Sequence, residues 1–420
     1  MGGARTNEAK TTGFTREQWR AIILCGIVFF LNTAPQGFMF AVITPVMEEL
    51  GISRVQFGTV VGISTLAGGI VSTFAGKIMA SISPRRTMMT GSLLIIPFAL
   101  LLGLANNLPV LVLAGLVLGC VVALGTVGVA SAVLRENLGA RMVAVFGLLS
   151  GIAFLSQACV GAVMGAYIPT YGYRPVVIIL GIVISLVGAL LTLGLPKQGL
   201  ASAPAPGAAG QAPAELPGLM LDEARRTQSF WIFGIATFLS AMLFSGLVLY
   251  IIDFFVQNGM AYPQAATMYS LLTIASAITT AFSGFFVRKA GIKRFLYVML
   301  IGYAVGILVL ALGFPASGGV VAVALVGMVL CALVRPINIT PGLVVGDLFG
   351  PKDYAAISTY MMFFFMAGGG TVSIVLGGMV DIFKGDYTLP FVVMSVLSIA
   401  SLALFLISVR LSPMMAQNQS

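Results

Sequence analysis

Histidine is absent from the 420 residues, and charged residues make up only 8% of them. A soluble domain carries about a quarter charged residues, so this composition excludes a single large soluble core. The lack of histidine also removes the most common proton shuttle and zinc ligand of proteins. The chain is 59% hydrophobic, and its apolar residues gather in long uncharged runs. We therefore expect a membrane protein that crosses the bilayer many times.

Cysteine is scarce, and nothing around the cysteines suggests a metal site. The four cysteines are single residues within apolar runs, without a CxxC pair: Cys25, Cys120, Cys159 and Cys331. No carboxylate cluster accompanies them, so we expect neither a metal nor a cofactor. No nucleophile–base pair is recognisable either, which makes an enzyme the least favoured class. The basic residues behind the net charge of +9 are scattered between apolar runs, which does not fit a nucleic-acid-binding face.

The apolar runs are long enough for twelve helices that each cross the hydrocarbon layer. The first six cover approximately residues 20–47, 55–80, 87–106, 108–134, 142–168 and 175–196. The next six cover approximately residues 230–256, 264–287, 295–314, 319–347, 354–380 and 388–409. The first run is far longer than the apolar core of a signal peptide, so we interpret it as an uncleaved span.

A stretch rich in proline and small residues separates the two sets of six spans. We therefore divide the chain into an N-terminal half (1–196), a cytoplasmic linker (197–229) and a C-terminal half (230–420) with a short cytoplasmic tail. Within the linker, residues 221–226 are charged and suggest a short surface helix. The expected fold is all-α, with twelve transmembrane helices in two pseudo-symmetric six-helix halves around a central cavity.

The basic residues predict the orientation of these spans. Eighteen of the 22 Lys and Arg residues fall on the side of the N-terminus, three fall on the opposite side, and Arg335 lies within a span. Because cytoplasmic segments carry an excess of Lys and Arg, both termini are expected in the cytoplasm. We expect a multi-pass monomer in the cytoplasmic (inner) membrane.

One short motif occurs once in each half. Residues 76–86 join the second and third spans, and residues 284–294, which lie 208 positions further along, join the eighth and ninth. Both segments resemble the cytoplasmic signature G-x-x-x-D-R-x-G-R-R/K of the major facilitator superfamily. The acidic position of that signature is Ala80 in the first copy and Arg288 in the second, so the resemblance implies no charge relay there. It does imply cytoplasmic gating loops containing Gly76, Arg85, Arg86, Gly284, Gly291, Lys293 and Arg294.

Three other segments resemble one branch of this superfamily, the monocarboxylate transporters and oxalate/formate antiporters. They are residues 47–53, 347–351 and 377–387. In that branch a cation of the C-terminal half, often in the eighth span, meets the carboxylate of the substrate. The eighth span here has no charge before Arg288, so that position does not transfer. Arg335, in the tenth span, would have to play this part.

Arg335 is the only charged residue between positions 295 and 346. An unpaired arginine near the middle of a bilayer costs at least ~2.5–3.5 kcal/mol. Pro336 and Pro341 remove backbone donors, so we expect the helix to bend or break beside the charge. A buried cation at a broken helix is typical of a carrier's site for an anion. The alternative is a structural salt bridge with Asp253.

Other polar residues inside the predicted spans are candidates for contact with a solute. They are Asn338, Thr340, Asn32, Thr33, Gln36, Gln157, Tyr250 and Tyr360, and a hydrogen bond between helices is the alternative role of each. The first six spans contain no acidic residue. Asp253 is therefore the candidate for energy coupling if protons are involved, while sodium coupling lacks an embedded carboxylate cluster.

The sequence thus predicts a secondary transporter for a small organic anion, a mono- or dicarboxylate. Alternating access would operate as exchange, facilitated diffusion or proton symport. The alternative is an exporter of amphipathic or drug-like compounds, although the fifth span lacks the Gly-Pro signature that exporters of the superfamily tend to carry. A transporter-like sensor is disfavoured because the linker of about 33 residues contains no recognisable domain.

Overall fold

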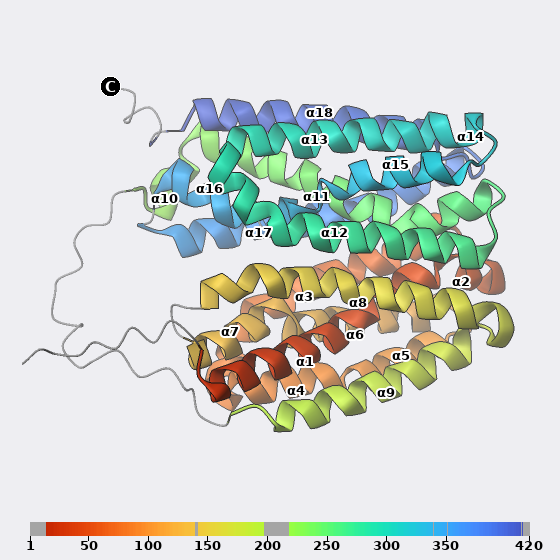
Figure 1. Cartoon of the computed structure of the whole chain (residues 1–420), viewed down its shortest axis with the longest axis horizontal. Coiled ribbons are helices and arrows are strands. Elements are labelled where there is room, and N and C mark those ends of the chain that lie inside the picture. The colour runs from red at the N-terminus through yellow and green to blue at the C-terminus, as the bar shows by residue number, and fades with distance from the viewer. Residues whose placement is uncertain are drawn as a thin grey trace, which may run out of the picture.

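The structure is a computed structural model that describes residues 14–138, 142–196, 218–338, 340–350, 352–412 and 414, and these residues are nearly all helical. Twelve helical segments are long and apolar enough to cross a membrane, which confirms the predicted number. Figure 1 shows two groups of helices side by side, α1 to α9 below and α10 to α18 above. The all-α fold with two six-span halves is therefore confirmed.

In the described residues of the N-terminal half, six spans are built from eight helices, and a further short helix, α2, lies outside them. They are α1 (Arg16–Ala41), α2 (Ile43–Leu50), α3 (Arg54–Ile82), α4 (Pro84–Leu93), α5 (Ile95–Gly103), α6 (Leu108–Gly125), α7 (Val127–Leu138), α8 (Met142–Tyr171) and α9 (Tyr173–Leu193). Two of the six spans are interrupted. One combines α4 with α5, and the other combines α6 with α7.

The C-terminal half is interrupted more often. It contains α11 (Gln228–Gln257), α12 (Tyr262–Ala290), α13 (Ile292–Leu308), the π-helix η2 (Val309–Gly313), α14 (Phe314–Ala316), α15 (Val321–Ala332), the 3₁₀-helix η3 (Arg335–Asn338), α16 (Thr340–Phe349), α17 (Tyr354–Ile382) and α18 (Thr388–Arg410). The short helix expected near residue 221 is present as α10 (Leu221–Arg225). Residues 197–217 of the predicted linker lie outside the described residues, and the limits of the linker remain a prediction.

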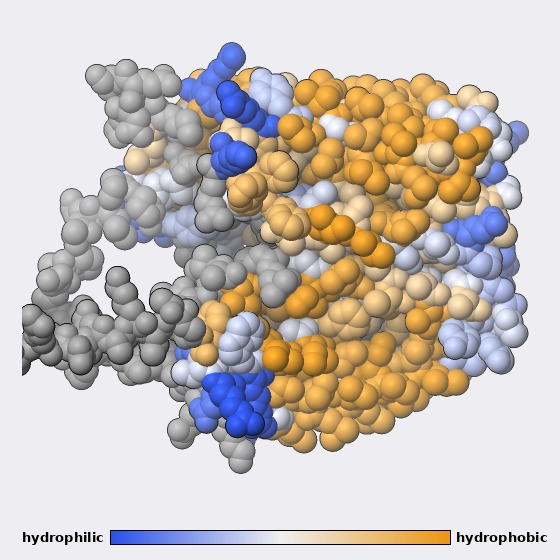
Figure 2. Space-filling view, in the orientation of Figure 1, coloured by the Kyte–Doolittle hydropathy of each residue, from blue (hydrophilic) through white to orange (hydrophobic). Residues whose placement is uncertain are grey.

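Two polar ends and an apolar belt fit this molecule to a bilayer. α1 begins and α18 ends on one face, which we call the terminal face and which lies at the left of Figure 1. The opposite, far face contains the end of α1 and the beginning of α18. Figure 2 shows a broad hydrophobic surface between these faces and hydrophilic residues near both. Apolar side chains that face lipid need no further partner, since the bilayer core is as apolar as they are.

The two halves meet mainly through two helix pairs, α8 with α12 and α3 with α17. Their backbones approach closely at small residues. A Cβ atom on Gly58 of α3 would lie 2.0 Å from the carbonyl oxygen of Ser373 in α17. Only glycine allows such an approach, so this contact fixes the distance between the halves at this level.

The tenth span is broken where the prolines predict a break. α15 ends at Ala332, η3 occupies residues 335–338, and α16 begins at Thr340. Pro336 cannot donate a backbone hydrogen bond, and Pro341 occupies the first turn of α16, where a missing donor costs little. The prediction of a bent or broken helix beside Arg335 is thus confirmed.

The repeated motif has the same backbone conformation in both halves. Ser83, between α3 and α4, has φ 80° and ψ 150°, and Gly291, between α12 and α13, has φ 79° and ψ 156°. The two residues lie 208 positions apart, as the sequence motif does. The prediction that Gly76 and Gly284 belong to loops is wrong, because both lie inside helices, α3 and α12. Nothing in either sequence interrupts these helices before the turn residue itself.

The four basic residues of the motif also lie in helices. Arg85 and Arg86 belong to the first turn of α4, and Lys293 and Arg294 belong to the first turn of α13. Arg85 donates from Nε to the carbonyl oxygen of Thr192, at 3.0 Å, and from its terminal nitrogen to that of Leu193. Because the last carbonyls of a helix lack partners within it, Arg85 caps α9.

Replacing Ser83 with glycine should stabilise the protein. The conformation of Ser83 is one that side chains other than glycine adopt only at a cost of about 1–3 kcal/mol. Its hydroxyl accepts a long bond of 3.5 Å from the Arg86 amide, and glycine in place of a capping serine costs only a few tenths of a kcal/mol. We expect Ser83→Gly to raise the midpoint of thermal unfolding in detergent and Gly291→Ser to lower it. Unchanged midpoints in both variants would contradict the strain at this turn.

Candidate functional site

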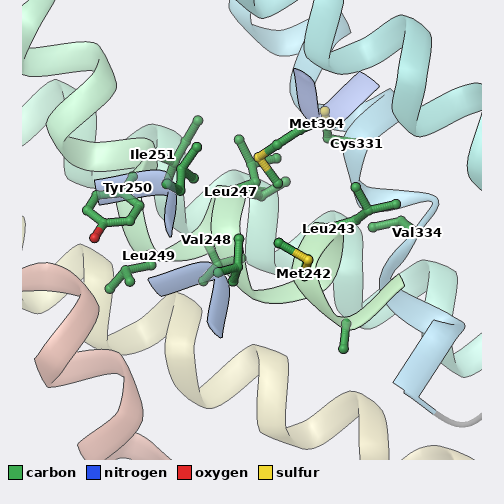
Figure 3. Close-up of a cluster of buried hydrophobic side chains, with 14 of the residues drawn as sticks. Met242, Leu243, Leu247, Val248, Leu249, Tyr250, Ile251, Cys331, Val334 and Met394 are labelled. Atoms are coloured by element: carbon green, nitrogen blue, oxygen red, sulfur yellow. The ribbon is translucent and has the colours of Figure 1, made fainter. Parts of the chain in front are cut away.

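Arg335 lies inside the protein, at the break of the tenth span. Its side chain starts from η3, between α15 and α16, and only 3% of the residue is exposed. One terminal nitrogen donates to the carbonyl oxygen of Phe244 in α11, at 2.6 Å. Figure 3 shows Cys331 and Val334, which precede it, in a buried cluster with Leu243 and Leu247 of α11. The guanidinium is therefore held away from both water and lipid.

Aromatic rings from both halves surround this guanidinium. Its central carbon lies 4.7 Å from the ring centroid of Phe244 and 5.8 Å from that of Phe154 in α8. The two rings contact each other at 6.2 Å, and Phe365 of α17 contacts Phe244 at 5.5 Å. A cation over a ring face gains about 0.5–2 kcal/mol, more when water is excluded. Phe154 belongs to the N-terminal half, so the halves share the surroundings of Arg335.

Polar groups without partners lie near the same cation. α12, which carries Tyr269, packs against η3, the turn of Arg335. Among the described residues, the Tyr269 hydroxyl and the Asn338 carbonyl oxygen are buried and lack a hydrogen-bond partner. Leaving a buried polar group unpaired costs about 1–3 kcal/mol. A bound solute with its own donors and acceptors would remove this cost.

The predicted alternative for Arg335, an ion pair with Asp253, is wrong. Among the side chains that the structure describes, Arg335 has no carboxylate within ion-pair distance, and Asp253 pairs with Arg54 instead. The described contacts therefore leave most of the five guanidinium N–H groups without an acceptor oxygen. A carboxylate can accept two parallel hydrogen bonds from such a group.

A second polar cluster joins the halves at the far face. Nε of Arg54, at the start of α3, lies 2.7 Å from Oδ2 of Asp253 in α11, and a terminal nitrogen lies 3.4 Å from Oδ1 of Asp381 in α17. Asp253 is fully buried and also accepts a hydrogen bond from the Tyr387 hydroxyl. Oδ2 of Asp381 accepts from the Val55 amide at 3.0 Å. We call Arg54, Asp253, Asp381 and Tyr387 the far-face latch.

Further hydrogen bonds close the same end. The Tyr250 hydroxyl donates to the carbonyl oxygens of Ser373, at 2.6 Å, and Arg54, at 3.2 Å, and the Tyr262 hydroxyl donates to that of Ala41, at 2.8 Å. The bonds that Arg54, Tyr250 and Tyr262 make between the halves all lie near the far face. The conformation is therefore closed at the far face by a set of polar contacts.

A small cavity of about 180 Å³ lies beside the latch. Its walls include Thr44, Glu48, Arg54, Asp253 and Gln257. The described residues contain no group of three or more His, Cys, Asp or Glu side chains placed to hold a metal ion.

Several predicted solute-binding residues have their polar groups engaged elsewhere. Asn32 donates to the Gly125 carbonyl at 3.0 Å and accepts from the Ser92 hydroxyl at 2.8 Å, so it joins helices of the N-terminal half. The Thr33 hydroxyl donates back to its own helix, to the carbonyl oxygen of Phe29. Tyr250 belongs to the closure of the far face, as described above. For these three residues, the interhelical or local hydrogen bond is the role that the structure shows.

The remaining candidates are spread over the molecule. Gln36 is half-buried in α1, and Gln157 is buried in α8. Tyr360 is 38% exposed and lies under the guanidinium of Arg225, which is 4.0 Å from its ring centroid. Thr340 begins α16, and its side chain lies outside the described residues. Among these candidates, Asn338 lies in the same 3₁₀ turn, η3, as Arg335.

Sequence reasoning missed the groups that complete both clusters. Phe154, Phe244 and Tyr269 look like ordinary packing residues in their apolar runs, and nothing in the sequence distinguishes them from their neighbours. Arg54 stands out in the sequence only as a basic residue on the far side. Its pairing with Asp253, 199 positions away, depends on how α3 and α11 are placed in space.

Comparison with known proteins agrees with this architecture. The family model described as Major Facilitator Superfamily matches residues 23–370. A segment of 189 residues is 26% identical to the 4-hydroxybenzoate transporter PcaK of Pseudomonas putida, and the match covers 44% of this chain and 41% of the length of that relative.

The fold is similar to those of solved transporters. A mutant of the nucleoside transporter NupG superimposes with a TM-score of 0.75 at 16% identity, covering 94% of this chain and all of the other. A bacterial homolog of the human lysosomal transporter Spinster, in an inward-facing and unoccupied conformation, gives a TM-score of 0.70 at 15% identity and covers 95% and 98% of the two chains. At these identities the likeness concerns the fold alone.

Removing the charge of Arg54 from the latch should destabilise the protein more than removing the charges of both Arg54 and Asp253. Breaking a buried ion pair from one side costs about 3–5 kcal/mol, because the remaining charge stays unpaired. We expect Arg54→Gln to lower the thermal midpoint in detergent, because it leaves Asp253 buried without a cation, and Asp253→Asn to lower it less, because Arg54 keeps Asp381. The double variant should recover part of the loss of Arg54→Gln. Glu49→Gln is the control, since the Glu49–Arg174 pair is exposed and such pairs contribute about 0–1 kcal/mol. Strictly additive losses would contradict the pairing.

Proposed function

The chain belongs to the Major Facilitator Superfamily, and we propose that this secondary transporter carries a small organic anion, a mono- or dicarboxylate. We place it in the cytoplasmic membrane with its terminal face toward the cytoplasm, since the basic residues gather there. The predicted branch of monocarboxylate transporters and oxalate/formate antiporters is part of the same proposal.

One observation carries the proposal. Arg335 is buried at the break of a span and, within the described part of the molecule, has no acidic partner. Charged residues without a partner are rare inside membranes and usually have a function, because burying the charge is costly. A solute carboxylate supplies the missing countercharge and is held by two parallel hydrogen bonds. The ring faces of Phe154 and Phe244 would then cover the apolar body of the same solute.

The similarity to PcaK supports an organic acid as the substrate class. That relative transports 4-hydroxybenzoate, an aromatic acid. Aromatic rings around Arg335 and the unpaired hydroxyl of Tyr269 suit an acid with an apolar body and a polar group at a distance from its carboxylate. We therefore include hydroxylated aromatic carboxylates among the solutes to be tested.

Alternating access follows from the way the halves share the site. With the latch closed, the solute reaches Arg335 from the terminal face, when α8 and its Phe154 move away from the C-terminal half. Binding of the carboxylate neutralises the guanidinium, which lowers the electrostatic cost of closing the site again. Opening of the latch on the other side then releases the solute.

Exchange or facilitated diffusion is the mode that we favour. Asp253, the candidate for proton coupling, is paired with Arg54 and bonded to Tyr387 in the closed far face. Neither exchange nor facilitated diffusion requires a side chain that gains and loses a proton during the transport cycle. In proton symport, Asp253 would have to leave Arg54 and take up a proton whenever the far face opens.

Replacing Arg335 should abolish transport of the anion. We expect Arg335→Gln to eliminate counterflow of a labelled carboxylate in proteoliposomes while expression and folding are retained. Arg335→Lys should retain a small fraction, because an ammonium supplies the charge but no planar pair of donors. Arg410→Gln, an exposed residue at the end of α18, is the matched control. Normal counterflow by Arg335→Gln would refute the assignment of the site.

Tyr269→Phe should weaken solute binding without destabilising the empty protein. Removing a buried hydroxyl that has no described partner recovers some of its desolvation cost, so the thermal midpoint should stay or rise. Affinity for 4-hydroxybenzoate should fall by roughly 10-fold, the equivalent of one lost hydrogen bond, while affinity for benzoate changes little. Equal losses for both acids would show that the hydroxyl does not contact the solute.

A further inference from the structure

The half of the tenth span that follows Arg335 is held by few neighbours. Within the described chain, α16 packs mainly against α17 and η3. It follows and contacts η3, the turn that begins with Arg335, whereas α15 ends before the break. A helix of ten residues is about 15 Å long, so α16 reaches from the site toward the terminal face. α11 and α12 also pack against η3, so the far end of α16 is one of three supports of this turn.

The end of α16 is capped by residues from outside the span. The last carbonyls of a helix need partners from other segments. The Leu219 amide donates to the Phe349 carbonyl oxygen at 2.8 Å, and the Ser412 hydroxyl donates to that of Leu348 at 2.8 Å. Leu219 belongs to the described C-terminal part of the predicted linker, residues 218–227, which we call the docking segment.

Further contacts fix the docking segment to the neighbouring end of α17. The Leu221 amide donates to Oδ2 of Asp353 at 2.9 Å. The Arg225 guanidinium stacks 4.0 Å above the ring centroid of Tyr360, and the Arg225 carbonyl accepts from the Trp231 indole at 2.9 Å. Phe230 contacts aromatic rings of both α16 and α17. Its ring centroid lies 6.1 Å from that of Phe349 and 6.3 Å from that of Tyr360.

We propose that the docking segment positions Arg335 by fixing the terminal end of α16, with the stack of Arg225 on Tyr360 as its main clamp. Tyr360 thus acts on the solute indirectly, as a positioning residue. The inference rests on the proposed function only where it concerns transport; the mechanical coupling from Tyr360 to η3 can be measured without a solute.

Alkylation of Cys331 measures this coupling directly. Cys331 is buried in the last turn of α15, four residues before Arg335, so a maleimide reaches it only through local opening. The rate of alkylation therefore reports how stable the local packing is. Cys25, Cys120 and Cys159 are first replaced with alanine. In this background Tyr360→Leu or Arg225→Gln should accelerate alkylation about two- to fivefold, the factor that corresponds to a lost cation–π contact. Limited trypsin cleavage after Arg226 monitors release of the segment.

Two matched variants serve as controls. Tyr360→Phe keeps the ring face and should restore the slow rate. Phe285→Leu removes another cation–π contact, that of Lys289 at 5.9 Å at the end of α12, and should leave Cys331 unaffected. In transport assays with 4-hydroxybenzoate, Tyr360→Leu should raise KM by a similar factor with little change in maximal rate.

The outcomes separate the two proposals. Faster trypsin cleavage of Tyr360→Leu with an unchanged rate at Cys331 overturns the positioning role, whatever the transport assay shows. The positioning role is also overturned if Phe285→Leu accelerates alkylation to the same extent as Tyr360→Leu. The expected alkylation pattern in a protein that exchanges no carboxylate supports the positioning role and refutes the proposed function.

Discussion

Keeping a guanidinium away from water inside a membrane is the constraint that shapes this protein. Such a charge is tolerated only where backbone carbonyls, ring faces or a counterion replace water. The protein supplies the first two, through the Phe244 carbonyl and the rings of Phe154 and Phe244. The break in the tenth span contributes to this arrangement, because Arg335 lies in the 3₁₀ turn at the break. The counterion is the component that a solute can supply.

A need to open the site from one side at a time explains the polar seal at the far face. A rigid seal at both faces would trap the site, whereas a seal at one face leaves the other free to open. Charged groups form the seal at the far face, and close glycine contacts such as Gly58 with Ser373 align the helices next to it. Arg54 and its acidic partners can separate at moderate cost only when water enters, so opening of the far face requires that the cluster be hydrated.

The sequence was sufficient for the architecture and for the break of the tenth span beside Arg335. Long apolar runs predicted twelve spans, the repeated motif predicted two related halves, and prolines beside an isolated cation predicted the break at Arg335. These features are local, so they are visible in a single chain. The partners of Arg335 and Asp253 come from helices distant in sequence, and no local pattern shows which side of a uniformly apolar helix faces inward. Asn32, Thr33 and Tyr250 are candidates because of their polarity, yet their polar groups serve helix packing, the commonest use of such groups in a bilayer.

The most direct test of an anion site at Arg335 is whether the purified protein recognises a carboxylate as such. Ligands that bind the folded state raise its thermal midpoint by mass action. A panel of aromatic and aliphatic acids should therefore be compared with their methyl esters and amides, which keep the shape but lose the charge. We predict that one or more acids stabilise the protein while the matching esters do not. Stabilisation by neutral or cationic compounds, with no response to any carboxylate, would contradict an anion site.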